Sequence, residues 1–264
     1  MPDFTIDPPV VLSFSHLDPC GASGIQADIE TLSSLGVHCA PICTSLSAQD
    51  TLSIHHSTPM AATLIIEQAR AILEDMPVKA FKLGWLGNSN NIEAIHTILT
   101  DYPHIPVVFD PCLKLGEPED DHFIQAIQAL LLPQCDIVIL NTVEAHLLAP
   151  EADNLRACAS EIHSYDCEHS LITGCQNTAN KIASHLYDVH GLLKQYQQQR
   201  IKKPFCGAGS TLSASITAYL SHDFSLLEAV QQAHKYTWES LNHGRRIGMG
   251  QLLPNRLYWA ESRH

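Results

Sequence analysis

Short apolar runs alternate along the chain with longer segments in which apolar residues recur every three or four positions. The short runs are rich in β-branched residues and predict buried strands at 10–15, 38–48, 80–86, 106–111, 136–141 and 169–174. The longer segments predict helices over 24–36, 59–76, 89–102, 121–132 and 143–150. A repeated strand–helix order is typical of a mainly parallel central sheet with helices on both faces. We therefore expect an α/β fold.

The pattern changes in the last third of the chain. Segments 182–191 and 192–201 alternate apolar and polar residues, which predicts a β-hairpin. Segments 210–220 and 225–244 have helical periodicity and predict two closing helices. No fixed-period repeat or linker interrupts the pattern, so a single domain over residues 1–264 is the expected organisation.

Composition fits a globular protein with a sizeable core. The chain has 264 residues, of which 45% are hydrophobic, and a mean hydropathy of −0.01. Its net charge of −13 argues against nucleic acid as a partner, although a local site can still attract a phosphorylated ligand. The apolar runs are too short to span a bilayer, and the acidic start does not resemble a signal peptide. We expect a cytoplasmic protein that does not contact a membrane.

The cysteines and histidines show no metal-binding pattern. The nine cysteines contain no C-x-x-C pair, so neither zinc nor a dithiol site is predicted, and reduced thiols are expected. The sixteen histidines show no ligand spacing, and His55 and His56 are predicted to face opposite sides of a short strand.

Glycines cluster where the helix 210–220 is predicted to start. Gly207, Ala208 and Gly209 directly precede Ser210, although glycine inside a helix costs about 1 kcal/mol relative to alanine. One explanation is an anion site, because free N–H groups and the helix dipole attract negative charge. The alternative is an ordinary helix start in which Ser210 or Thr211 is the N-cap and the glycines only permit the turn.

Polar residues follow the predicted strands, at the edge of the sheet where open α/β folds bind ligands. They are Asp18, Gly21, Gln49, Lys82, Asp110, Asn141 and Thr173. This order predicts a site that is assembled from many loops.

Asp28, inside the predicted helix 24–36, and two of the positions after strands each have a structural explanation as well as a chemical one. Asp28 is a candidate for holding a small polar substrate, or a solvated charge on its helix. The Gln49 amide suits the edge of a heterocycle, but a polar loop requires no such role. Asp110 suits a phosphate-handling site, whereas Pro111 favours an ordinary turn after the strand.

Asn141 and Glu144 are three residues apart at a predicted helix start. This spacing puts both side chains on one face of the first turn, where they could hold the waters of Mg²⁺. A capping box, with Asn141 as the cap and Glu144 reaching back, explains the same residues equally well.

The order of these motifs resembles that of hydroxymethylpyrimidine/phosphomethylpyrimidine kinases, a thiamine-pathway branch of the ribokinase-like superfamily. The resemblance extends from about Val10 to Asn242. The longest segments on which it rests are "DPCGASGIQADIETLSSLGV" and "GAGSTLSASITAYL". Between them lie the shorter segments "SAQDT", "KLGWL", "FDP", "LNTVEA" and "LITG". The resemblance implies a ribokinase-like fold, a need for ATP and Mg²⁺, and phosphoryl transfer to a pyrimidine hydroxymethyl group or its monophosphate. It also implies a homodimer in many cases.

By position, the resemblance assigns roles to most of the candidate residues. The pyrimidine would contact Gly21, Asp28, Gln49 and Trp85, and the nucleotide would lie beside Asn141, Thr173 and Gly174. Glu144 would organise magnesium together with Asp110, and Gly207, Ala208 and Gly209 would form the anion hole beside Ser210.

The chain departs from the family pattern at several positions. Ser210 stands where most pyrimidine kinases have cysteine and ribokinases have aspartate, which predicts weakened turnover, with the hydroxyl orienting the substrate. Trp85 replaces a common methionine and is expected to stack on a pyrimidine or to narrow the pocket. His16 and Cys175 replace glycines, and Lys114 corresponds to a loop lysine of the family.

Two alternatives to a pyrimidine kinase remain open at this point. A pyridoxal kinase would share the fold and a similar flat hydroxymethyl heterocycle. A binding protein would keep the pocket but would have lost turnover through Ser210.

Overall fold

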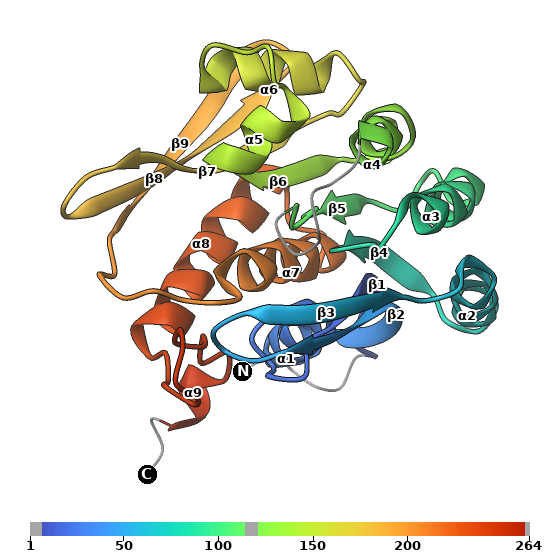
Figure 1. Cartoon of the computed structure of the whole chain (residues 1–264), viewed down its shortest axis with the longest axis horizontal. Helices are drawn as coiled ribbons and strands as arrows, with labels where there is room; N and C mark the ends of the chain where they lie inside the picture. The colour runs from blue at the N-terminus through green and yellow to red at the C-terminus, as the bar shows by residue number, and fades with distance from the viewer. Residues whose placement is uncertain (1–6, 114–120, 262–264) are drawn as a thin grey trace.

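A nine-stranded sheet extends through the part of the chain that the computed structural model describes, residues 7–113 and 121–261 (Figure 1). The strands are β1 (Val10–Leu17), β2 (His38–Gln49), β3 (Ile54–Pro59), β4 (Val78–Leu83), β5 (Val107–Phe109), β6 (Ile137–Asn141), β7 (Ser170–Asn177), β8 (Lys181–Asp188) and β9 (Gly191–Gln199). Their order is β3-β2-β1-β4-β5-β6-β7-β8-β9, and all pairs from β2 to β7 are parallel. The mainly parallel sheet and the β8–β9 hairpin are confirmed.

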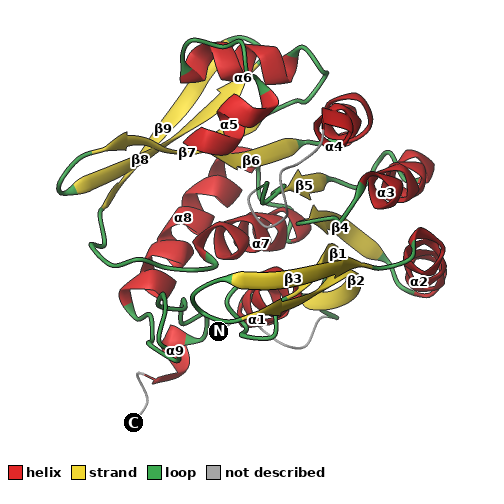
Figure 2. Cartoon of the chain, viewed as in Figure 1, coloured by secondary structure: helices red, strands yellow, loops and turns green. Residues whose placement is uncertain are grey.

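Helices cover both faces of this sheet (Figure 2). They are α1 (Gly24–Ser34), α2 (Ala62–Asp75), α3 (Ser89–Asp101), α4 (Asp121–Ala126), α5 (Thr142–Leu148), α6 (Leu155–His163), α7 (Ala208–Ser221), α8 (Leu226–Asn242) and α9 (Tyr258–Glu261). Helices α2 to α6 contribute to one apolar core, whereas α1, α7 and α8 pack on the opposite face. None of the helices in the described residues is long and apolar enough to cross a membrane.

Alternating residues of the central strands enter different cores. In β6, Val138 and Leu140 pack against the α2–α6 side, whereas Ile137 and Ile139 pack against α7 and α8. Because both faces of these strands are buried, their sequences are continuous apolar runs rather than alternating ones. This double burial explains why the strands could be predicted from the sequence.

The prediction that Pro59 opens a helix is wrong. Pro59 is the last residue of β3, where it pairs with Ser45 of β2, and α2 starts only at Ala62. β3 is the edge strand of the sheet, a position that tolerates a residue without an N–H group. His55 and His56 do lie in this short strand.

Other helical segments differ from the prediction in extent. The segment predicted as one helix over 121–132 is α4 followed by a π-helical turn over Ile127–Leu131 and a 3-10 turn that ends at Gln134. Helices α6 and α9 were not predicted. α6 is short and starts at Asn154, whose side chain accepts hydrogen bonds from the N–H groups of Arg156 and Ala157.

The buried face of α1 differs from the predicted apolar stripe of Ile25, Ile29, Leu32 and Leu35. Ile25 and Leu32 are buried, but Ile29 is 38% exposed. Asp28, the neighbour of Ile29, is fully buried instead. The helix therefore presents a carboxylate to the sheet.

Candidate active site

A buried ion pair connects α1 to the central strand β4. An Asp28 oxygen lies 3.0 Å from the Nζ of Lys82, and both side chains are 0% exposed. The Ser13 hydroxyl of β1 donates to the other Asp28 oxygen at 2.7 Å. The interpretation of Asp28 as a solvated charge is therefore wrong, because its carboxylate is buried and paired with the Lys82 ammonium.

Asp110, directly after β5, is the second carboxylate near Lys82. It is buried and accepts a hydrogen bond from the Ser213 hydroxyl of α7 at 3.0 Å. Burial raises the pKa of Asp110, and Lys82 and Ser213 offset only part of the rise. Burial alone would lower the pKa of the Lys82 ammonium. The negative charges around it, those of Asp28 and Asp110 first, have the larger combined effect, so its pKa is raised. Lys82 is therefore a buried cation that is paired with Asp28 and whose charge is also favoured by Asp110.

Helix α7 starts without a side-chain cap. Its N-cap is Gly207, which has a φ of +83° and provides no side-chain hydrogen bond. The predicted N-cap role of Ser210 or Thr211 is therefore wrong. Among the described residues, only Thr211 of the first turn has its N–H bonded, to the Gly207 carbonyl. The N–H groups of residues 208–210 have no such partner, so they are available to an anion.

The glycines at this helix start have different requirements. A Cβ on Gly207 would collide with the Ala22 carbonyl, and its positive φ also favours glycine. A Cβ on Gly209 would lie at ordinary contact distance, 3.7 Å from an Asp110 oxygen. Gly207 is thus required by the approach of the neighbouring loop, whereas Gly209 leaves space between α7 and the Asp110 carboxylate.

Ser210 lies in the same first turn and is 4% exposed. No hydrogen bond of its hydroxyl is found among the described residues, whereas its carbonyl accepts from Ser213. The predicted residues Gly209, Ser210 and Asp110 are therefore brought together at one end of α7.

Asp18 organises the loop between β1 and α1. Its carboxylate accepts hydrogen bonds from the N–H groups of Cys20 and Ser23 at 2.9 and 2.8 Å. Gly21, at the loop's tip, has a φ of +74°. This loop lies against the start of α7, because its Ala22 carbonyl faces Gly207.

Gln49, the last residue of β2, lies beside this loop. Its Oε1 accepts from the Ser47 hydroxyl at 2.8 Å, and its amide nitrogen is 4.0 Å from the Cys20 sulfur. A cavity of about 340 Å³ is lined here by Pro19, Cys20, Gln49, Asp50, Thr51, Leu52, Gly248 and Met249. Gln49 is therefore accessible to a ligand next to the loop.

His16 is buried beneath the same loop. Its Nε2 is 3.2 Å from the Ser23 hydroxyl, whereas its buried Nδ1 has no hydrogen-bond partner among the described residues. Burial lowers the pKa of His16 to about 4, against a partial opposing effect of Asp18. The imidazole is therefore neutral near pH 7.

Trp85, after β4, lies in the hydrophobic core. Its indole is 6% exposed and packs against Phe123 of α4, with ring centroids 5.1 Å apart. It lines none of the cavities described for this structure. A contact between Trp85 and a substrate stays a prediction.

Asn141 and Glu144 form a capping box at the start of α5. The Asn141 side chain accepts from the N–H groups of Val143 and Glu144, and the Glu144 carboxylate accepts from the Asn141 N–H at 2.8 Å. The structural alternative for this pair is therefore confirmed, and its metal role stays a prediction.

The Glu144 carboxylate also lies close to the segment that follows Asp110. Its Oε1 accepts from the Leu113 N–H at 3.2 Å. Cys112, between them, has a φ of +51°, a conformation that is strained for a non-glycine residue. Burial raises the pKa of the Cys112 thiol, and the carboxylates of Asp110 and Glu144 add to the rise. Both carboxylates thus flank Cys112.

Thr173 and Gly174 lie next to the α5 start. Thr173 pairs with Asn141 across β6 and β7, and its hydroxyl donates to the Leu140 carbonyl at 3.2 Å. Gly174 has a φ of +77°, and a Cβ there would meet nothing within 4 Å. The structure therefore brings the three predicted nucleotide-binding residues together. Lys114 lies outside the described residues.

Arg256 near the C-terminus was not predicted. Its side chain is buried, although arginine is rarely so, and it contacts both the Asp18–Gly24 loop and α7. No local motif marks this arginine, because its partners are far away in the sequence.

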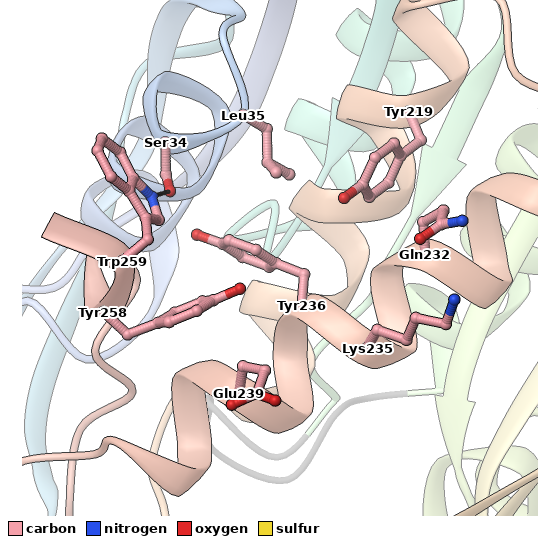
Figure 3. A pocket seen from close by; sticks show the side chains of 9 residues that line it. All are labelled: Ser34, Leu35, Tyr219, Gln232, Lys235, Tyr236, Glu239, Tyr258 and Trp259. Atoms are coloured by element: carbon pink, nitrogen blue, oxygen red, sulfur yellow. Dashed lines mark hydrogen bonds between the residues drawn. The ribbon is translucent and has the colours of Figure 1, made fainter. Parts of the chain in front are cut away.

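A second cavity, of about 220 Å³, lies between α1, α7, α8 and α9 (Figure 3). It is lined by Ser34, Leu35, Tyr219, Gln232, Lys235, Tyr236, Glu239, Tyr258 and Trp259. None of these is a predicted site residue, so this cavity is separate from the candidate site.

Comparison with known proteins provides a family match over most of the chain. The family model described as phosphomethylpyrimidine kinase matches residues 18–255. A hydroxymethylpyrimidine/phosphomethylpyrimidine kinase of Staphylococcus aureus is 30% identical over 93% of this chain and 92% of its own length. The enzyme of that name from Haemophilus influenzae is 30% identical, over 96% and 97% of the two chains.

Solved structures show the same fold. The pyridoxal kinase from Staphylococcus aureus in complex with pyridoxal has a TM-score of 0.85 at 23% identity, over 96% of this chain and 94% of that one. A phosphomethylpyrimidine kinase from Clostridium difficile 630 has a TM-score of 0.75 at 23% identity, over 88% and 99% of the two chains. The ribokinase-like fold is therefore confirmed.

Proposed function

The chain belongs to the phosphomethylpyrimidine kinase family, and from this premise we propose that it phosphorylates a hydroxymethylpyrimidine or its monophosphate with ATP, in thiamine biosynthesis. The observation that carries the proposal is the uncapped start of α7. Among the described residues the N–H groups at 208–210 have no partner, Gly209 lies beside Asp110, and the charge of Lys82 acts on the Asp110 carboxylate. This is the arrangement that a phosphoryl group requires, because oriented donors stabilise its charge without reorganisation.

In the proposed reaction, the hydroxymethyl oxygen of the pyrimidine, or a phosphate oxygen of its monophosphate, forms a bond to the γ-phosphorus of ATP. The bond between that phosphorus and the β–γ bridging oxygen breaks, ADP leaves, and any proton on the attacking oxygen is released to solvent. Such transfers depend mainly on positioning and charge stabilisation. The amides of residues 208–210 would bind the transferring group, and Gln49 would hold the heterocycle at the loop end of the site.

Asp110 and Glu144 provide a suitable donor set for magnesium. Mg²⁺ prefers oxygen ligands and keeps several waters. Both carboxylates already accept hydrogen bonds from the chain, so we infer that they would hold the ion through its waters. When bound, the ion would neutralise charge on the nucleotide phosphates.

Ser210 is expected to orient the substrate hydroxyl rather than to remove its proton. A serine hydroxyl is a poor base near neutral pH. If the weaker acidity of serine limits the rate, Ser210→Cys should raise kcat. Ser213→Cys, one turn further along the buried helix, is the comparison variant. An unchanged or lower kcat in Ser210→Cys would contradict the prediction that serine at this position weakens turnover.

Pyridoxal is the second candidate substrate. The chain shares its fold with pyridoxal kinases, and pyridoxal also carries a hydroxymethyl group on a flat ring. The family match over residues 18–255 favours the pyrimidine. We further propose that the protein is a cytoplasmic homodimer. Sedimentation analysis of the purified chain would test whether it is a dimer.

An assay of ADP release, with ATP and Mg²⁺ supplied, tests the function directly. We expect turnover with 4-amino-5-hydroxymethyl-2-methylpyrimidine or with its monophosphate, at a higher kcat/KM than with pyridoxal. A preference for pyridoxal would identify the second candidate. Nucleotide binding without turnover of any of the three would indicate a binding protein.

A further inference from the structure

We propose that Arg256 is a positioning residue that fixes the Asp18–Gly24 loop relative to the first turn of α7. The inference rests on the proposed function, because the loop would face the substrate and α7 its phosphate. Arg256 directly follows the family match, which ends at residue 255, and carries none of the predicted roles. Its side chain is among the largest fully buried side chains of the described residues.

The guanidinium bonds three segments that are distant in the sequence. Its Nε donates to the Thr211 hydroxyl of α7 at 3.0 Å. Nη1 donates to the Gly21 carbonyl at 3.1 Å, and Nη2 donates to the Ala22 carbonyl. Nη1 also lies 3.0 Å from a carboxylate oxygen of Glu30, on α1. The planar fork of arginine meets these acceptors together, which a lysine cannot do.

The main chain of Arg256 is itself held in place. Its carbonyl accepts hydrogen bonds from the hydroxyls of Ser34 and Tyr236, each at 2.7 Å. The Trp259 indole donates to the Ser34 hydroxyl at 2.8 Å, and Figure 3 shows these side chains at the wall of the second cavity. The preceding N–H, of Asn255, donates to the Ser240 carbonyl. Arg256 therefore extends from a fixed base.

The guanidinium of Arg256 lies where the Asp18–Gly24 loop meets the start of α7. The Ala22 carbonyl that accepts from Arg256 is the same group that excludes a Cβ at Gly207. Thr211, which accepts from Arg256, also donates to the Gly207 carbonyl at 2.8 Å. Arg256 thus sets the distance between the loop and the open N–H groups without touching a substrate.

Turnover of single and double variants tests this role. Arg256→Lys keeps the charge but loses the fork, and Thr211→Val removes the contact with Arg256 together with the Thr211 bond to the Gly207 carbonyl. We expect each to lower kcat per folded molecule by about tenfold or more, since small misplacement of reacting groups is costly. Because both variants lose the contact between Arg256 and Thr211, the double variant should lose clearly less than the two single losses combined. Arg70→Lys, on the exposed surface of α2, is the matched control and should leave kcat unchanged.

A purely structural arginine would give a different result. Its replacement would lower the melting temperature but would leave kcat per folded molecule within about twofold of the wild type. Fully additive losses in the double variant would also overturn the proposal, because the two residues would then act independently.

Hydrogen exchange of the ligand-free protein separates this inference from the proposed function. The N–H groups of Gly21 and Ser23 are bonded to Asp18 in the loop, and that of Thr211 is bonded in α7. Arg256→Lys should accelerate exchange in both segments together, whereas Arg70→Lys should not. Unchanged exchange would overturn the inference even in an active enzyme, and an inactive wild type with accelerated exchange in the variant would overturn only the proposed function.

Discussion

Helices α5 and α7 both start at the candidate site, but their first turns are completed in opposite ways. At α5, the Asn141 side chain accepts from two N–H groups, and Glu144 returns a bond to the Asn141 N–H. At α7, Gly207 has no side chain, and among the described residues the N–H groups of positions 208–210 have no partner. One helix start is closed by its own residues, and the other is left open.

This difference shows that similar sequence patterns at two helix starts can have different functions. Both starts contain residues that suit a polar ligand, yet a capped start has already used its donors. An uncapped start retains donors and the positive end of the helix dipole. We infer that α7 binds the transferring phosphate, whereas α5 presents a carboxylate to the metal.

The largest effect is expected from Gly207→Ala, which closes the α7 start. A left-handed alanine costs about 1–2 kcal/mol, and overpacking against the Ala22 carbonyl adds about 1–3 kcal/mol. The free energy of unfolding in urea should therefore fall by about 2–5 kcal/mol, and kinase activity should be lost. An alanine variant as stable as the wild type would show that the loop does not press on the helix start.

Acid should destabilise the loop side of the α7 start through His16. Its imidazole stays neutral in the folded protein down to a pKa of about 4, but in the unfolded chain it binds a proton near pH 6.5. The free energy of unfolding should therefore fall as the pH drops from 6.5 to 4, by about 3 kcal/mol from this residue. His16→Asn should make the free energy of unfolding depend less on pH. If urea titrations gave the same pH dependence for the wild type and for His16→Asn between pH 6.5 and 4, the prediction would be contradicted.

Gly209→Ala should separate catalysis from stability at α7. The added methyl group makes only ordinary contacts, and alanine gains up to about 1 kcal/mol of helix propensity. It would also occupy the space that faces Asp110, so we expect kcat to fall by about tenfold, about 1.4 kcal/mol of barrier. An unchanged kcat would place the phosphate elsewhere.

The smallest effect is expected at the capped helix. Asn141→Ala should lower the free energy of unfolding by about 1 kcal/mol, and Asn141→Ser should restore most of it, because serine is an equivalent cap. If Asn141 only caps α5, serine should also restore kcat. A kcat that stays low in the stable serine variant would show that the amide has a second role beside the nucleotide.

The sequence allowed the sheet and the order of the site residues to be predicted. Strands buried on both faces appear as continuous apolar runs, as in Ile137–Leu140, and ligand-binding residues follow such strands. Asp110 and Asn141 could be located for this reason, and Ser210 from the glycines before its helix, although the family resemblance was needed to assign them roles.

Contacts between distant segments could not be predicted. The partner of Asp28 is Lys82 on strand β4, so the pattern of helix α1 alone favoured a solvated charge. The need for Gly207 arises from the Ala22 carbonyl, and the importance of Arg256 arises from the same loop. Pairings of this kind depend on tertiary structure rather than on local periodicity.

A crystal structure with a non-hydrolysable ATP analogue, magnesium and the hydroxymethylpyrimidine would test the central claim most directly. We predict terminal phosphate oxygens at hydrogen-bond distance, about 2.7–3.2 Å, from the amide nitrogens of Gly209 and Ser210, with the Asn141–Glu144 capping box intact. A terminal phosphate bound elsewhere, with only water at the first turn of α7, would contradict the account.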